Sequence, residues 1–66
     1  MGFKTRLKEL REAEKLSQAQ LAKELDLPRY TISDWEQGRA EPDTVMLTKL
    51  ADFFDISLDY LLGREI

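Results

Sequence analysis

A chain of 66 residues has room for one small domain, which at this size buries only about 60% of the surface that the unfolded chain exposes. The chain contains no cysteine and no histidine, so we expect neither an enzyme nor a metal site nor a cofactor. The net charge of −3 argues against a nucleic-acid partner, because phosphate binding relies on lysine and arginine.

The uneven distribution of charge weakens that objection. Six basic and four acidic residues lie in 1–25, whereas four basic and nine acidic residues lie in 26–66. One end of the molecule could therefore face an anion. The N-terminus lacks the apolar core of a signal peptide, and no run approaches the roughly 18 apolar residues of a membrane span. We therefore expect a soluble, cytoplasmic protein without a membrane partner.

Two helices are predicted in the first part of the chain. Apolar residues at helical spacing predict a helix over 4–14. These residues are Phe3, Leu7 and Leu10. Ser17 and Gln20 fit a capping box, which predicts a second helix over 17–25. Its inward residues would be Leu21, Ala22 and Leu25.

A third helix is predicted over 28–37. Asp26 tolerates a left-handed backbone and Pro28 cannot continue a helix, so the second helix should end before them. Pro28 then suits the first turn of the third helix, and Gly38 suits its C-terminal cap. The inward residues would be Ile32 and Trp35.

Two further helices follow. Asp43 is a good N-cap for a fourth helix over 43–55, and Ser57 for a fifth over 57–63. The apolar stripe of the fourth helix is Leu47, Leu50, Ala51 and Phe54. No segment alternates apolar and polar residues as a strand would. The sequence therefore predicts an all-α fold, a compact five-helix domain that covers residues 1–66.

The connection between the second and third helices is very short, only Asp26-Leu27-Pro28. It forces a sharp angle between two short helices that both pack on the first. This geometry is a helix-turn-helix, in which the second helix of the pair turns its outer face away from the body. A helix has the right width for the major groove of DNA.

Short motifs occur in a fixed order along nearly the whole chain. They are Gln18-Ala19-Gln20-Leu21-Ala22, Leu25, Leu27, Ile32-Ser33, Trp35-Glu36, Gly38, Pro42, Leu50-Ala51 and Leu58-Asp59-Tyr60-Leu61-Leu62-Gly63. In order and spacing they resemble the helix-turn-helix domains of the phage repressor and Cro type, often called XRE-like. The resemblance implies a lambda-repressor-like fold and a transcriptional regulator, most simply a repressor, of bacteria or phages. It also implies sequence-specific binding to a palindromic duplex DNA operator, commonly as a homodimer.

The resemblance also implies roles for single residues. Gln18 matches a glutamine that grips a phosphate at the positive end of a helix dipole. Arg11 and Glu36 match an internal salt bridge between the first helix and the end of the third. The positions that approach base edges are Arg29, Tyr30, Ser33 and Asp34. Further phosphate contacts are expected from Arg39, Thr31 and Lys8.

The side chains expected at the bases have suitable chemistry. Arg29 can fork onto guanine O6 and N7, and Asp34 can accept from cytosine N4. Tyr30 can reach a phosphate or a thymine methyl, and Ser33 can serve several bases. Three of them have a plainer alternative: Arg29 as a solvated surface residue, Asp34 as a specificity filter that repels phosphate, and Tyr30 as a packing residue.

Several features depart from this simple picture. Asp26 stands where the family usually has glycine, and the loop after the third helix carries Glu41 and is followed by Asp43, which weakens the expected grip on phosphate. Some apolar residues lie off the inward stripes and could line a dimer patch or be ordinary exposed residues. They are Met46, Phe53 and Tyr60.

A protein-interaction module on the same fold is the alternative function, for example part of an antitoxin or the target of an anti-repressor. The acidic balance favours it, and duplex binding that did not weaken with salt would indicate it. The remaining carboxylates, lysines, tyrosines and serines form no recognisable catalytic arrangement, and no small-molecule ligand is evident.

Overall fold

Five helices make up the domain in the computed structural model, which describes residues 2–64. They are α1 (Phe3–Ala13), α2 (Gln18–Glu24), α3 (Arg29–Gln37), α4 (Thr44–Phe54) and α5 (Leu58–Leu62). Within this range there is no strand, and the expected all-α, five-helix fold is confirmed. None of the helices described is long and apolar enough to cross a membrane.

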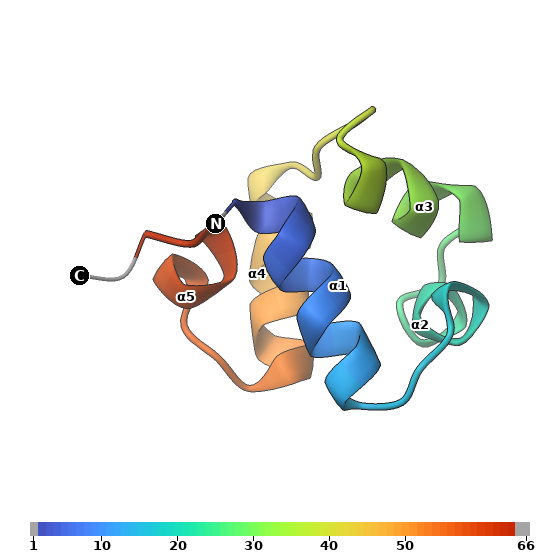
Figure 1. Ribbon diagram of the computed structural model, residues 1–66, viewed down its shortest axis with the longest axis horizontal. Helices are drawn as coiled ribbons and strands as arrows, with labels where there is room; N and C mark the ends of the chain where they lie inside the picture. The colour runs from blue at the N-terminus through green and yellow to red at the C-terminus, as the bar shows by residue number, and fades with distance from the viewer. Residues whose placement is uncertain (1, 65–66) are drawn as a thin grey trace.

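Helix α1 lies in the middle of the molecule (Figure 1). It packs against α3 on one side and against α5 on the other, and α4 packs against α5. Helices α2 and α3 pack closely on each other. The arrangement therefore places the α2–α3 pair on one side of α1 and leaves α5 on the opposite side.

Three helices start at the side-chain caps that the sequence predicts. The side chains of Ser17, Asp43 and Ser57 each accept the backbone N–H of the third residue along, at 2.9 or 3.0 Å. The Gln20 side chain also accepts the N–H of Ser17 at 2.8 Å, which completes the predicted capping box. Each cap satisfies an N–H group that the helix itself cannot pair.

The helix ends rely on left-handed residues. Gly38 and Gly63 end α3 and α5 with φ of 78° and 72°. Lys15, Asp26 and Asp55 follow α1, α2 and α4 with φ between 56° and 60°, where a side chain is strained. The left-handed backbone expected at Asp26 is therefore confirmed, and aspartate tolerates it better than most residues do.

Pro28 does not occupy the first turn of α3, contrary to the prediction. It is the N-cap, with φ −64° and ψ 147°, and Arg29 is the first helical residue. The Pro28 carbonyl accepts the N–H of Thr31 at 3.1 Å, so the proline opens the helix from outside it. The other predicted ranges differ by one residue at each end, because they include cap residues or, for α1, start one residue late.

All five helices contribute to one core. Its buried apolar residues are Leu7, Leu21, Ala22, Ile32, Trp35, Leu50, Ala51 and Leu61. The other predicted inward residues, such as Phe3 and Phe54, are half-buried at its edge. The Phe3 ring meets the Trp35 ring edge-on, with centroids 6.5 Å apart, so the start of α1 also rests on α3.

Replacing Leu50 by alanine should lower the free energy of unfolding by about 2–5 kcal/mol, because Leu50 is fully buried and the change leaves a cavity. Urea denaturation followed by circular dichroism measures the loss. Val45→Ala is the control on the same helix: Val45 is 65% exposed, so the change should stay within about 0.5 kcal/mol. Equal losses in the two variants would show that the inward face of α4 is wrongly assigned.

Candidate nucleic-acid interface

The turn between α2 and α3 is held by backbone and apolar contacts. The N–H of Leu27 donates to the carbonyl of Ala22 at 2.8 Å, which folds the chain back over the end of α2. The Leu27 side chain packs against the core, and Pro28 then opens α3. Since α3 buries Ile32 and Trp35, its opposite face must point outward.

The outward face of α3 carries the side chains that the sequence assigns to base edges. The residues of this face are Arg29, Tyr30, Ser33, Asp34 and Gln37. Their spacing follows the helical repeat, so they form one ridge, called here the α3 ridge. Tyr30 is 68% exposed, which argues against its alternative role in packing. Thr31 lies beside the ridge in the first turn and is half-buried.

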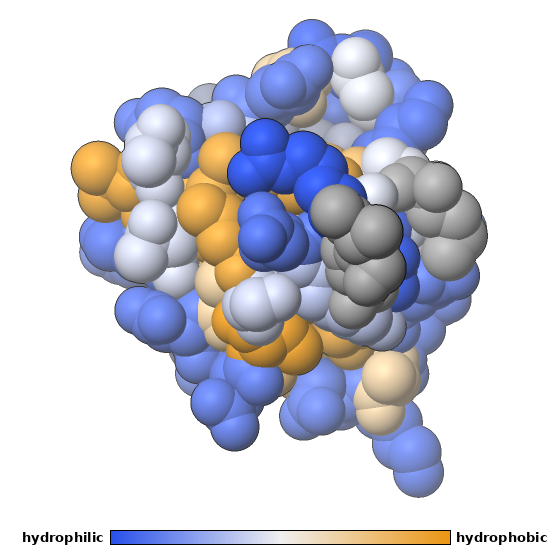
Figure 2. Space-filling view, turned by 90° about the vertical axis from the view of Figure 1, so that its left-hand side faces the viewer, coloured by the Kyte–Doolittle hydropathy of each residue, from blue (hydrophilic) through white to orange (hydrophobic). Residues whose placement is uncertain are grey.

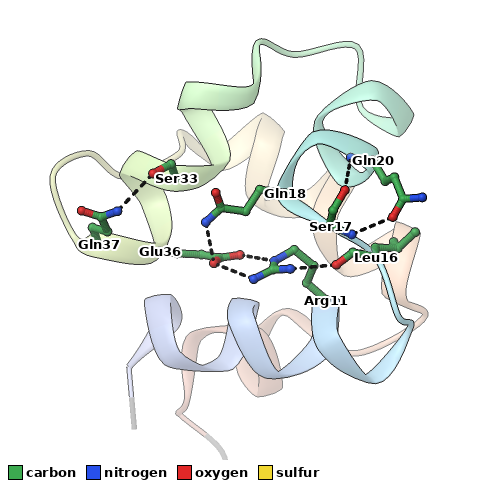
Figure 3. Close-up of polar contacts among 8 residues, drawn as sticks. All are labelled: Arg11, Leu16, Ser17, Gln18, Gln20, Ser33, Glu36 and Gln37. Atoms are coloured by element: carbon green, nitrogen blue, oxygen red, sulfur yellow. Dashed lines mark hydrogen bonds and ion pairs between the residues drawn. The ribbon is translucent and has the colours of Figure 1, made fainter.

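A chain of hydrogen bonds links the second half of the α3 ridge to Arg39. The Gln37 amide donates to the Ser33 hydroxyl at 3.1 Å, as Figure 3 shows. The Arg39 guanidinium donates to the Gln37 amide oxygen and, through Nε, to Asp34 Oδ1 at 3.0 Å. Asp34 therefore does not present a bare negative charge. Sequence reasoning missed Gln37, although its position four residues after Ser33 placed it on the same face.

A buried ion pair joins α1 to the last turn of α3. Arg11 donates to the two carboxylate oxygens of Glu36 at 2.6 and 3.1 Å, and to the carbonyl of Leu16 at 2.7 Å (Figure 3). The side chains of Arg11 and Glu36 are only 11% and 3% exposed. The structure thus contains the ion pair that the resemblance implies. Arg11 also binds the connection between α1 and α2, through the carbonyl of Leu16.

The environment of Arg11 keeps its charge in place. The hydrogen bond to Glu36 raises the pKa of Arg11 above its ordinary value and outweighs burial, which acts in the opposite direction. A group whose pKa is raised on folding contributes stability below its unfolded pKa, and this is lost only as the pH rises through the folded pKa. The guanidinium therefore stays ionised, and its contribution is constant, throughout the neutral range.

Gln18, the first residue of α2, is held by the same carboxylate. Its Nε2 donates to Glu36 Oε1 at 3.1 Å (Figure 3). An ionised carboxylate only accepts hydrogen bonds, so Glu36 selects the orientation in which the amide nitrogen of Gln18 faces it. The capping box uses the N–H groups of Ser17 and Gln20, which leaves those of Gln18 and Ala19 at the positive end of the helix.

Basic residues of α1 line up beside the end of α3. A Cβ placed on Gly38 would lie 3.5 Å from Lys4 Nζ, so the Lys4 side chain lies against the end of α3. Arg11, two turns further along, contacts Glu36. Lys8 is exposed on the same stripe of α1 between them, and its phosphate contact stays a prediction. Sequence reasoning missed Lys4, because only the packing of α1 on α3 brings it to Gly38.

A hollow and the acidic side chains are the features relevant to a small ligand or a metal ion. A hollow of about 320 Å³ opens between the start of α1 and the loop after α3, with a lining that is mainly apolar. Its lining residues are Gly2, Phe3, Lys4, Trp35, Gly38, Ala40 and Glu41. Across residues 2–64 there is no group of three histidine, cysteine, aspartate or glutamate residues placed to hold a metal ion.

The residues of the predicted dimer patch have different surroundings. Phe53 is exposed at 38% and meets Phe54 edge-on, whereas Met46 is half-buried against the core. The Tyr60 ring is half-buried and carries the Arg6 guanidinium 4.0 Å above it. Figure 2, which views the molecule from the α5 side, shows apolar surface interrupted by polar side chains. A dimer patch on these residues stays a prediction.

Comparison with known proteins places these features in a family. A family model described as helix-turn-helix matches residues 7–61. The transcriptional activator BcrR of Enterococcus faecalis is 38% identical over 65 residues, which are 98% of this chain and 32% of BcrR. The transcriptional regulator ImmR of Bacillus subtilis is 35% identical over 65 residues, 98% of this chain and 51% of ImmR. The phage CTXphi transcriptional repressor RstR of Vibrio cholerae is 38% identical over 64 residues, 97% of this chain and 57% of RstR.

The chain spans about a third to just over half of the length of these relatives. Two solved structures are similar along nearly its full length. The P22 c2 repressor in complex with a synthetic operator has a TM-score of 0.88 and 31% identity, and the match covers 98% of both chains. A transcriptional regulator from Listeria innocua has a TM-score of 0.89 and 30% identity over 97% of this chain and 60% of the other.

Replacing Glu36 by alanine should cost about 3–5 kcal/mol of unfolding free energy, because it leaves the Arg11 charge buried without its partner. Urea denaturation near pH 7 gives the number. Arg64→Ala serves as the control, since it removes an exposed ion pair with Asp59 and should cost less than about 1 kcal/mol. A Glu36→Ala protein as stable as the control would refute the structural importance of the buried pair.

Proposed function

Because the chain belongs to the helix-turn-helix family, of the phage repressor and Cro type, we propose that it binds duplex DNA sequence-specifically as a transcriptional regulator. The α3 ridge carries the proposal. It presents Arg29, Tyr30, Ser33 and Asp34 on one outward face of a helix that is seated on the core by Ile32 and Trp35. A helix anchored in this way can enter the major groove and place these side chains at base edges.

The surroundings of the ridge suit the flanking phosphates. The first turn of α2, at Gln18, offers N–H groups at the positive end of a helix. Lys4 on α1 and Arg39 after α3 supply positive charge at the C-terminal end of α3, and Lys8 adds an exposed charge on α1. Phosphate contacts of this kind position a protein on the duplex, whereas the ridge would read the sequence.

Part of the negative charge of the chain lies away from the α3 ridge. The segment that ends α4 and forms α5 carries Asp55 and Asp59, both exposed. Helix α5 lies on the other side of α1 from α2 and α3 (Figure 1). Exposed charges further apart than the Debye length, about 8 Å at physiological salt, are largely screened. Asp55 and Asp59 would therefore do little to repel DNA docked on the α3 ridge, whereas the exposed Glu41 and Asp43 in the loop after α3 would weaken the grip on phosphate.

The simplest regulatory role is that of a cytoplasmic repressor that occupies an operator. A homodimer would place two α3 helices about 34 Å apart on one face of the duplex, and its operator would be a palindrome with half-sites about one turn apart. The names of relatives support both directions of control, because BcrR is an activator and RstR a repressor.

Selection of duplexes from a random-sequence library by the purified protein, at about 50 and 200 mM salt, tests the function. We expect enriched sequences whose binding weakens steeply with salt, because neutralised phosphates release counterions. A palindrome among them would support the dimer. Failure to enrich any duplex at the lower salt would refute DNA binding and favour a protein-interaction module on the same fold.

Replacing Arg29 by alanine should remove the preference at one base pair of the selected sequence, at a cost of about 1–3 kcal/mol in discrimination. The melting temperature should hardly change, because Arg29 is exposed on the α3 ridge. Binding to single-base-pair variants of the selected duplex, together with thermal denaturation, measures both. A large fall in melting temperature would instead assign Arg29 to the structure.

A further inference from the structure

The sequence pattern Asp-x-x-x-Gly-Arg occurs twice, at the ends of α3 and α5. The two copies are residues 34–39 and 59–64. In both, the glycine has a left-handed backbone, and the backbone N–H of the arginine donates to the backbone carbonyl of the aspartate at 2.9 Å. The chain thereby turns back over the last helical turn and brings the two side chains together. The guanidinium then meets the carboxylate at 3.0 Å in the first copy and 3.2 Å in the second.

The two copies differ in how firmly they hold their arginine. In the α5 copy, Asp59 and Arg64 are both about two-thirds exposed. In the α3 copy, Asp34 is only 31% exposed, and Arg39 also donates to Gln37, whose amide is in turn bonded to Ser33. The pair of Asp34 and Arg39, called here the clasp, therefore joins Arg39 to the α3 ridge.

We propose that the clasp makes DNA binding by α3 more selective for base sequence. Asp34 holds Arg39 away from DNA phosphates unless a base takes the place of Arg39 as the hydrogen-bond donor to the carboxylate. This inference rests on the proposed DNA-binding function. Arg39 follows the end of α3, where the backbone of a duplex would pass, so it can either stay on Asp34 or move to a phosphate. If it moves, Asp34 is left as an unpaired carboxylate close to phosphates, which is unfavourable.

Cytosine relieves that conflict best. Adenine N6 also donates in the major groove, but the N7 acceptor beside it repels a carboxylate. The exocyclic amine of cytosine donates a hydrogen bond in the major groove, and a carboxylate accepts it. On a cytosine, Asp34 accepts from this new donor and Arg39 becomes free to bind a phosphate. On other bases the two interactions oppose each other. The clasp therefore couples a base contact to a phosphate contact. Asp34 both binds the matching base and disfavours binding to the others.

The strength of the clasp suits this role. Exposed ion pairs contribute at most about fivefold to an equilibrium, and Arg39 is 58% exposed, so DNA can open the clasp. Its effect on binding must be of the same size. When Arg39 binds a phosphate, the dependence of log affinity on log salt should also become steeper by about 0.9.

Asp34→Asn tests the proposal, because it keeps the shape of the side chain and removes the charge that holds Arg39. The probe is a 24-base-pair duplex pool of random sequence, titrated between roughly 50 and 200 mM salt. Relative to wild type, the variant should bind this pool roughly two- to fivefold more tightly, with a salt slope steeper by about 0.9. Its preference among single-base-pair variants of the selected duplex should fall at one position.

Asp59→Asn is the matched control, because it makes the same change of charge in the same motif on α5. The slope of log affinity against log salt for Asp59→Asn should equal that of wild type. Any increase in its affinity reflects the change of net charge alone and is subtracted from the increase measured for Asp34→Asn. The double variant Asp34→Asn with Arg39→Ala should lose the extra slope. If Asp34→Asn and Asp59→Asn behave alike while wild type binds DNA, the clasp is refuted and the proposed function stands. If wild type shows no salt-dependent DNA binding, both proposals fall.

Discussion

The buried ion pair between Arg11 and Glu36 is the constraint on which the candidate interface depends. The apolar contacts of Ile32 and Trp35 hold α3 on the core, but such contacts are non-directional. Three hydrogen bonds from one guanidinium give α3 a definite position relative to α1 and to the α1–α2 connection. Gln18 binds the same carboxylate, so the start of α2 is aligned by it as well. A buried pair seldom adds stability over apolar packing, and here its use is orientation.

The distribution of polar contacts explains how an acidic domain can offer a face for an anion. Glu36 is neutralised inside the domain by Arg11, and Asp34 is paired on the surface with Arg39. The two acidic residues of α3 therefore leave little uncompensated charge on that side, while Lys4 and Lys8 lie next to it on α1. The net charge of the chain is a poor guide to the field at one face, because pairing and position decide it.

Local signals made most of the architecture predictable. Ser17, Asp43 and Ser57 cap the helices that they were expected to start, because a cap depends only on residues three positions apart. The inward positions of Ile32 and Trp35 followed from helical periodicity in the same way. Pro28 was misplaced by one residue, because its fixed φ suits both an N-cap and a first turn and only the observed ψ distinguishes them.

The sequence by itself thus determined the five helices, their caps, the tight α2–α3 turn and, through a family resemblance, the residues of the α3 ridge other than Gln37. The tertiary structure alone decided which side chains from different helices meet: Lys4 with the end of α3, and Gln18 with Glu36. The physical reason is the separation along the chain. Caps and periodicity depend on residues only a few positions apart, whereas contacts between different helices form only once the helices are packed.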